Sequence, residues 1–541
     1  MTTKRLPLLF ILSGLLLGIS FPHVGGLTFL VFFALIPLLI GENFIYEKRL
    51  RPRKALWLSY LGFIVFNLVV GWWLLYASFV GMLLAVIVNA FYMAFFFWIF
   101  HLVHRRYGNY WGYTAFIFLW LTYEYCQNFW EISFTWLNFG YAFASKHTWI
   151  QWYEYTGIGG GTLWVLLVNL IGFKIVQKIY YKNIAPKKLI FGLACWLTLI
   201  ALPLISSFVI YSSYKEKKDP IDVVVVQPNI NPNNGDKFEH LSGEEQMSIF
   251  LREAFMVMDT NVDFMVGPET ALPYSINEGK LKESGEYDLL MRVLAQLPKT
   301  SILIGMSSRN EYKKNENHPE NATVFEDGSA MERYNAALFL ENNGDYKIYH
   351  KSQLMLGVEK IPYTKWLPFL ESLAINLGGD VGTLGSEKEP KVFSTKLNKA
   401  KIAPSICLES SYVEFMSKFV LAGANVIFVI TNDGWWEDTP GYRQHFEYGR
   451  VLAISLRRSI AQSANTGTSG FIDQRGDVIQ HTNWWEPCAL RKKINLNDDI
   501  TFYALHGDLI YRLSVYFSLA FFLLYLYAFI FGKNFVKMGE V

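Results

Sequence analysis

Long apolar runs fill the first part of the chain and return near its end, and a stretch of mixed polarity separates them. A helix needs about 20 apolar residues to cross the hydrocarbon core of a bilayer. The chain therefore predicts eight membrane-spanning helices, at residues 6–21, 27–40, 55–76, 80–100, 111–130, 162–180, 189–211 and 509–531. This pattern predicts three regions: a seven-span transmembrane domain at 1–211, a polar domain at 212–508, and a C-terminal transmembrane helix with a short tail at 509–541.

The first apolar run also allows a second interpretation, a cleaved signal peptide. Lys4 and Arg5 precede the run, as basic residues do in secretory signals. However, the run has no small-residue cleavage site, and further apolar runs follow at once. A spanning helix is therefore the favoured interpretation.

Basic residues cluster before the first run and after every even-numbered run, which predicts the orientation in the membrane. Lys and Arg in short loops favour the cytoplasmic side. The loops at residues 77–79 and 131–161 carry only Lys146. We therefore expect both termini in the cytoplasm and the polar domain on the outer face. The basic residues are Lys4, Arg5, Lys48, Arg49, Arg51, Arg53, Lys54, Arg105, Arg106, Lys178, Lys182, Lys187, Lys188, Lys533 and Lys537.

The polar domain alternates short apolar runs, rich in β-branched residues, with longer amphipathic stretches. The apolar runs predict buried strands at residues 222–227, 264–266, 301–305, 337–340, 401–406 and 426–430. The amphipathic stretches predict helices at residues 243–259, 287–297 and 444–458. This alternation indicates an α/β or α+β domain with a largely covered sheet.

Composition excludes several classes of protein. Hydrophobic residues make up 52% of the sequence and charged residues 18%, against about 25% charged in typical soluble domains. Lys and Arg number 49 and Asp and Glu 46, so the net charge of +3 is too even for a nucleic-acid-binding protein. Four cysteines without metal-like spacing argue against a disulfide framework or a metal site.

Three residues near the apolar runs of the polar domain have catalytic chemistry: Glu269, Lys351 and Cys407. A thiol attacks as its thiolate, so it needs a nearby base and a cationic environment. Glu269 would take the proton, and the Lys351 ammonium would stabilise the thiolate and then an oxyanion. Each residue also has a structural interpretation, as a packed thiol or a solvated charge, and spacing alone does not choose between the two.

The motifs around these residues resemble the Glu–Lys–Cys triad of the nitrilase (carbon–nitrogen hydrolase) superfamily. They are Pro268-Glu269-Thr270, His350-Lys351 and Ile406-Cys407-Leu408-Glu409. With apolar spans before and after, the chain is similar over essentially its whole length to the integral-membrane branch, the apolipoprotein N-acyltransferases. Further segments that match are Trp136–Tyr141, Tyr155–Gly159, Val226-Gln227-Pro228-Asn229-Ile230, Glu359 within Gly357–Pro362, Thr431–Trp435, Gln444-His445, Arg457-Arg458 and Asn465-Thr466-Gly467.

The resemblance implies an α/β, nitrilase-like αββα sandwich joined to a polytopic α-helical membrane domain. It implies transfer of a fatty acyl group from a phospholipid, through a thioester on Cys407, to the free α-amino group of a diacylated apolipoprotein. Glu269 would be the base and acid, Lys351 would hold the oxyanion, and Glu359 and Glu409 would have supporting roles.

The same resemblance implies partners and a location. The partners are a phospholipid donor, a diacylated apolipoprotein acceptor and the lipid bilayer, with no nucleic acid, no metal and no organic cofactor. The location is the bacterial inner membrane, with the catalytic domain on the periplasmic face.

Two positions depart from the family pattern. The family usually has an aromatic residue directly after the nucleophile, where this chain has Leu408, and often a Trp near the position of Phe238. We expect both residues to contact substrate, together with Trp435 and Trp436 as interfacial aromatics. The apolar segment at residues 354–370 is interpreted either as core or as a lid that dips into the headgroups.

Two alternative functions stay open. One is a membrane-tethered nitrilase or amidase that transfers its acyl group to water, although seven spans are excessive for an anchor. The other is a transporter or lipid-binding scaffold with an inactive outer domain, which the intact triad disfavours.

We expect structural hydrogen bonds for His445 and His506, and a packed thiol at Cys488 that the fold keeps away from Cys407.

Overall fold

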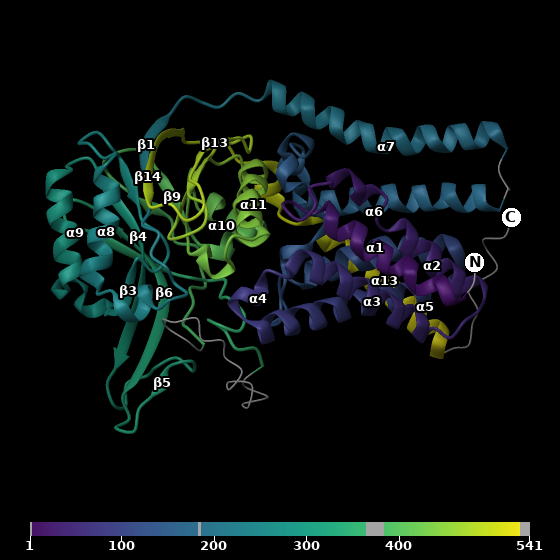
Figure 1. Ribbon diagram of the computed structural model, residues 1–541, viewed down its shortest axis with the longest axis horizontal. Helices are drawn as coiled ribbons and strands as arrows, with labels where there is room; N and C mark the ends of the chain where they lie inside the picture. Colours follow the sequence, from purple (N-terminus) through teal and green to yellow (C-terminus); the bar gives the residue numbers. More distant parts are fainter. Residues whose placement is uncertain (1–2, 182–184, 364–382, 531–541) are drawn as a thin grey trace. The chain divides into compact units, whose positions relative to one another are not determined.

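A computed structural model describes residues 3–181, 185–363 and 383–530 of the chain, which form two compact units (Figure 1). The first, here called the membrane unit, comprises Met1–Leu75, Phe79–Ser213 and His506–Val541. The second, the sandwich unit, comprises Tyr76–Ser78 and Tyr214–Leu505.

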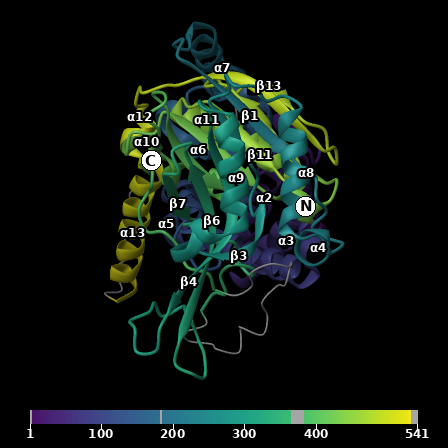
Figure 2. The ribbon, with the colours of Figure 1, turned by 90° about the vertical axis from the view of Figure 1, so that its left-hand side faces the viewer.

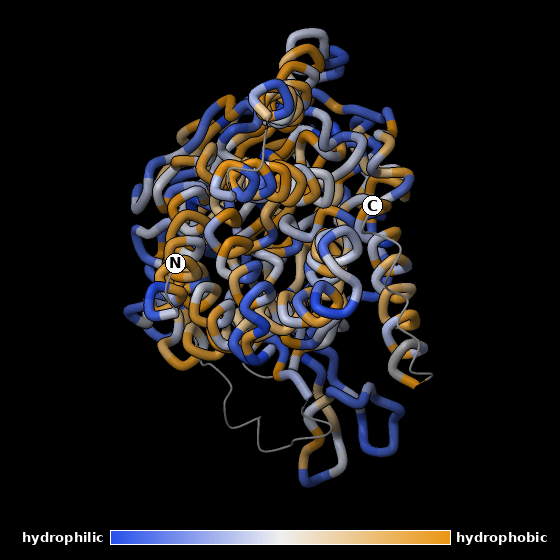
Figure 3. The backbone as a smooth tube through the Cα atoms, turned by 90° about the vertical axis from the view of Figure 1, so that its right-hand side faces the viewer, coloured by the Kyte–Doolittle hydropathy of each residue, from blue (hydrophilic) through white to orange (hydrophobic). Residues whose placement is uncertain are grey.

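Long apolar helices form the membrane unit, and Figure 3 shows hydrophobic stretches along them. Seven described segments are long and apolar enough to cross a membrane. The helices are α1 (Leu6–Ser20), α2 (Ile36–Glu47), α3 (Arg53–Gly71), α5 (Phe79–Cys126), α6 (Tyr153–Tyr180), α7 (Pro186–Ser213) and α13 (Leu509–Ile530). Helix α7 exposes large apolar side chains such as Phe191 and Leu202, which is favourable in lipid and unfavourable in water.

The structure separates two of the predicted spans at a glycine and changes the bounds of another. The fourth and fifth predicted spans both lie within α5, and Gly108, a non-helical residue with φ +76°, separates the two helical segments at that point. The helix expected at residues 27–40 has the wrong bounds, because the chain forms a short 3-10 helix at Thr28–Phe32 and α2 begins only at Ile36. Pro37 fixes the start of α2, since proline is accommodated in the first turn of a helix, where its missing N–H has no partner to lose.

Two β-sheets build the sandwich unit. The first has eight strands, in the order β14-β1-β2-β4-β6-β5, with β3 paired to β4 and β7 paired to β6. The second has the order β13-β12-β11-β10-β9-β8. The strands of the first sheet are β1 (Pro220–Gln227), β2 (Phe264–Val266), β3 (Leu272–Asn277), β4 (Ser301–Tyr312), β5 (Thr323–Val324), β6 (Ala330–Leu340), β7 (Tyr346–His350) and β14 (Cys488–Asn495). Those of the second are β8 (Phe393–Ser394), β9 (Lys401–Ile406), β10 (Val426–Thr431), β11 (Ile460–Ala464), β12 (Gly470–Ile472) and β13 (Val478–His481).

The sandwich unit has four layers, helices, sheet, sheet and helices (Figure 1), and in Figure 2 the helices of one outer layer lie in front of a sheet. Alternating apolar side chains hold the layers together. Val223 and Val225 of β1 face the second sheet and belong to the same core cluster as Phe428 of β10. Val224 and Val226, on the opposite face of the same strand, pack in a second core cluster with residues of α8 (Gly243–Phe255) and α9 (Gly285–Gln296). The second sheet is covered by α10 (Val413–Leu421) and α11 (Pro440–Leu456). The expected αββα sandwich is therefore confirmed.

Local sequence signals explain where the covering helices begin. Ser242 caps α8 by accepting a hydrogen bond from the Glu245 amide, and the Glu245 carboxylate returns a bond to the Ser242 N–H. This reciprocal capping satisfies two backbone donors that the first turn leaves free.

Two short helices, α4 (Leu74–Ala77) and α12 (Phe502–His506), include residues of both units.

Candidate active site

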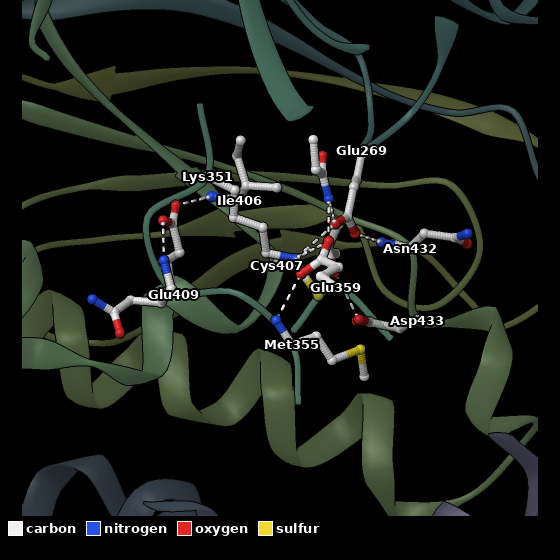
Figure 4. Close-up of polar contacts among 12 residues, drawn as sticks. Glu269, Lys351, Met355, Glu359, Ile406, Cys407, Glu409, Asn432 and Asp433 are labelled. Atoms are coloured by element: carbon white, nitrogen blue, oxygen red, sulfur yellow. Dashed lines mark hydrogen bonds and ion pairs between the residues drawn. The ribbon is translucent and has the colours of Figure 1, made fainter. Parts of the chain in front are cut away.

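Strand ends bring the three candidate catalytic residues to one cavity of the sandwich unit. Glu269 follows β2, Lys351 follows β7 directly, and Cys407 follows β9. All three side chains line the same cavity, although they come from different strands of two sheets (Figure 4). The fold therefore brings together the three residues that the sequence motifs single out.

Lys351 lies between two carboxylates in the interior. Its Nζ donates to Glu269 Oε1 at 3.1 Å and to Glu359 Oε1 at 2.9 Å, and the lysine is only 1% exposed. Burial alone would lower the pKa of Lys351, but the two carboxylates raise it well above its ordinary value. Lys351 therefore remains a fixed positive charge in the cavity wall.

Asn335 of β6 connects the same two carboxylates, and the sequence analysis missed it. Its Nδ2 donates to Glu269 Oε1 at 2.8 Å and to Glu359 Oε1 at 2.6 Å. Because both contacted atoms are acceptors, the amide must present its NH2 group to them. The backbone N–H groups of Asn432 and Met355 donate to the other oxygens of Glu269 and Glu359, at 3.1 and 2.7 Å.

Cys407 has a strained backbone and a buried thiol. Its φ is +54°, in the left-handed region that costs a non-glycine residue roughly 1–2 kcal/mol. Thr270, next to Glu269, has φ +48°, and such strain often gathers at functional sites. Burial raises the pKa of the Cys407 thiol well above its ordinary value, Glu269 raises it further and Lys351 lowers it. The resting form is therefore the thiol, which needs a base when it reacts.

Glu409 joins the loops that carry Lys351 and Cys407. Its Oε1 accepts from the backbone N–H groups of Ser352 and Gln353, at 2.7 and 3.1 Å, and from the Tyr349 hydroxyl at 2.7 Å. Its Oε2 accepts from the Ile406 N–H at 2.8 Å (Figure 4). The side chain is fully buried and does not line the cavity, so its contacts are with the protein chain.

The residues expected to contact substrate separate into two groups. Phe238, Trp435 and Trp436 line the cavity, and the rings of Phe238 and Trp435 stack with centroids 5.9 Å apart. Leu408 is partly buried, packs against the core cluster that contains Phe428, and does not line the cavity. The departure from the family pattern at Leu408 therefore lies outside the residues that line the cavity. Of the lid segment proposed at 354–370, residues 364–370 lie outside the described residues.

Gly305 of β4 allows the Glu269 loop to approach the sheet. A Cβ at this position would lie 2.6 Å from Glu269 Cα and from Pro268 O, closer than real Cβ atoms come. Only glycine fits there without displacing the backbone of Glu269. An isolated glycine in a strand is the signal of such a close approach.

Free thiols and metal-binding types of side chain are two further kinds of reactive group in the described residues. Cys407 and Cys488 are free, as are Cys126 and Cys195. Within residues 3–181, 185–363 and 383–530, no group of three or more His, Cys, Asp or Glu side chains is placed to hold a metal ion.

Two family models match the chain. The apolipoprotein N-acyltransferase N-terminal domain matches residues 13–171, and the carbon-nitrogen hydrolase domain matches residues 223–498. The apolipoprotein N-acyltransferase of Chlorobaculum tepidum is 30% identical over 514 residues, 92% of this chain and 92% of that protein. The protein of the same name from Geobacter metallireducens is 26% identical, over 93% of this chain and 92% of that one. Among solved structures, an amidase from Nesterenkonia sp. AN1 is 13% identical with a TM-score of 0.33, over 50% of this chain and 92% of its own.

Proposed function

The chain belongs to the apolipoprotein N-acyltransferase family, and on this premise we propose the reaction that its cavity performs. A fatty acyl group moves from a phospholipid to Cys407 and then to the free α-amino group of a diacylated apolipoprotein. The observation that carries the proposal is the cavity shared by Cys407, Glu269 and Lys351, in which the lysine bonds the Glu269 carboxylate at 3.1 Å.

In the first step Cys407 acts as the nucleophile. Its sulfur attacks the ester carbonyl of the phospholipid while Glu269 takes the thiol proton, since the buried thiol is protonated at rest. The tetrahedral intermediate then expels the glycerol alkoxide, which receives that proton from Glu269. The products are a lysophospholipid and an acyl thioester on Cys407.

In the second step the acceptor amine attacks the thioester carbonyl. Glu269 removes one proton from the amine, the bond between carbon and sulfur breaks, and the Cys407 thiolate regains a proton from Glu269. The product is an amide on the apolipoprotein, and the enzyme returns to its starting state without any external acid, base or cofactor.

Lys351 supplies the positive charge that both tetrahedral intermediates need. A fixed ammonium in a buried site stabilises a developing oxyanion far more than it would in water. Glu359 and Asn335 fix the positions of the Lys351 and Glu269 side chains through their hydrogen bonds. Glu409 fixes the loops on which Lys351 and Cys407 stand.

The substrates and the basic loops support a place in the bacterial inner membrane. Both substrates of the proposed reaction are anchored in lipid, and the membrane unit provides apolar helices of spanning length. From the distribution of Lys and Arg we propose cytoplasmic termini and a periplasmic sandwich unit.

The test is direct observation of the acyl-enzyme. Purified protein is mixed with a phospholipid that carries a labelled acyl chain, and the peptide that contains Cys407 is examined by mass spectrometry. We expect one acyl group on Cys407, released by hydroxylamine as a thioester is, and none in Cys407→Ala. Equal acylation of Cys407→Ala would reject the thioester.

A further inference from the structure

A buried Asp–His pair lies directly behind the nucleophile. His445 of α11 and Asp433, which follows β10, are both fully buried. His445 Nδ1 lies 3.0 Å from Asp433 Oδ1, and His445 Nε2 lies 3.1 Å from the backbone carbonyl oxygen of Cys407. None of the steps of the proposed mechanism uses this pair.

The contacts determine which way the hydrogen bonds run. The Asp433 carboxylate and the Cys407 carbonyl are acceptors, so a hydrogen bond from the imidazole to each of them requires a proton on both ring nitrogens. The Ser410 hydroxyl, 3.0 Å from His445 Nε2, also donates to the Cys407 carbonyl at 3.0 Å. Burial alone would lower the pKa of His445, but Asp433 raises it above its ordinary value, in agreement with a protonated ring.

Asp433 is itself held on two sides. The Thr431 hydroxyl donates to its Oδ1 at 2.7 Å, and its backbone N–H donates to the Thr466 carbonyl at 3.2 Å. The imidazole is therefore fixed at Nδ1 by an anchored carboxylate, and its other nitrogen reaches the residue that carries the thiol. That residue is the one with φ +54°.

We propose that His445 is a positioning residue for the nucleophile, because its Nε2–H clamps the carbonyl of Cys407 and with it the left-handed backbone that presents the thiol to the cavity. The proposal rests on the proposed role of Cys407 as nucleophile. A strained conformation persists only where its surroundings fix it, and two donors converge on the Cys407 carbonyl. His445 acts on the reaction through Cys407 and does not touch the acyl group.

Two substitutions separate this role from packing. The amide nitrogen of His445→Gln reaches about as far as Nε2 and preserves the bond to Cys407. The amide of His445→Asn reaches only about as far as Nδ1 and preserves the contact with Asp433. We expect His445→Gln to react within about threefold of wild type. His445→Asn and His445→Ala should react roughly tenfold to a hundredfold more slowly, the range that the loss of one hydrogen bond from a charged donor gives.

Two rates are measured on the full-length protein in detergent. One is the single-turnover formation of acyl-Cys407 from labelled phospholipid. The other is alkylation of Cys407 by iodoacetamide, read at the Cys407 peptide, which needs no phospholipid. The matched controls are His318→Gln and His318→Asn at an exposed histidine, which should leave both rates unchanged.

The order of the variants decides the outcome. Slow His445→Asn with near-normal His445→Gln supports the clamp, whereas equal rates for the two, or the reverse order, overturn it. If both variants fail to fold, Ser410→Ala serves instead: several-fold slower alkylation supports the clamp and an unchanged rate overturns it. If wild type forms no acyl-Cys407, the proposed function fails. The alkylation rates still test the clamp in that case, because it predicts that His445→Asn reacts more slowly than His445→Gln.

Discussion

Replacement of Asn335 tests whether its amide holds the two carboxylates in place. Asn335→Ala removes two hydrogen bonds to carboxylate oxygens, which the structure places at 2.8 and 2.6 Å. One hydrogen bond to a charged group contributes roughly 1.5–3 kcal/mol, and two from one amide are not additive. We expect the free energy of unfolding to fall by about 2–4 kcal/mol. Acyl-enzyme formation should slow by at least about tenfold, because the side chains of Glu269 and Lys351 are no longer held in place.

Asn335→Asp sharpens the test because it introduces a third carboxyl group beside Glu269 and Glu359. Like charges about 3 Å apart cannot all ionise, so the folded pKa of the introduced carboxyl lies above its unfolded value of about 3.9. While protonated, it restores one of the two lost bonds. That contribution to stability is complete below the unfolded pKa and is lost as pH rises through the raised folded pKa.

The assay is thermal unfolding of wild type, Asn335→Ala and Asn335→Asp in detergent from pH 5 to pH 9. At pH 5 the unfolding temperature of Asn335→Asp should be higher than that of Asn335→Ala, and this difference should disappear as pH rises. The unfolding temperature of Asn335→Ala should differ from that of wild type by the same amount at every pH. Asn317→Asp, at an exposed asparagine, is the control for an added charge. If the unfolding temperature of Asn335→Asp changes with pH in the same way as that of wild type, the contact of residue 335 with the two carboxylates is refuted.

Three further results are expected. Cys407→Ala and Glu269→Gln should stay folded and membrane-inserted but transfer no acyl group, as measured by lipopeptide acylation; turnover above background in Cys407→Ala would contradict the covalent step. Gly305→Ala should displace the Glu269 backbone and slow acyl-enzyme formation by roughly tenfold or more, and a normal rate would show that the strand yields at no cost to the site. In intact cells, a cysteine introduced at Asn343 should react with a membrane-impermeant thiol reagent and one at Lys187 should not, whereas labelling at Lys187 would reverse the orientation.

The sequence predicted strands at runs dominated by apolar residues and missed β14, whose pattern is interrupted by charged residues. β9 and β10 were recognised because every buried position carries an apolar or small residue. β14 was missed because Arg491, Lys492 and Lys493 interrupt its pattern. Arg491 is held by Asp222 and Asp259, partners far away in the sequence, so no local pattern identifies the strand.

The candidate site shows the same division. Glu269, Lys351 and Cys407 were found because each stands in a motif with neighbours of fixed type. Asn335 was not found because one polar residue in a strand has no distinctive signal until the fold brings it against two carboxylates. Leu408 was expected at the substrate because of its place after Cys407 in the motif, whereas in the structure it packs against a core cluster and does not line the cavity.

The central claim is that the acyl group passes to an amine and not to water, and one measurement tests it most directly. Enzyme is incubated with labelled phospholipid alone, then with a diacylated lipopeptide that has a free N-terminal amine, and in parallel with the same lipopeptide after acetylation of that amine. We expect at most one acyl group per enzyme and almost no free fatty acid from phospholipid alone, discharge by the free amine, and none by the acetylated lipopeptide. Continuous release of free fatty acid without lipopeptide would contradict the account and make the protein a hydrolase.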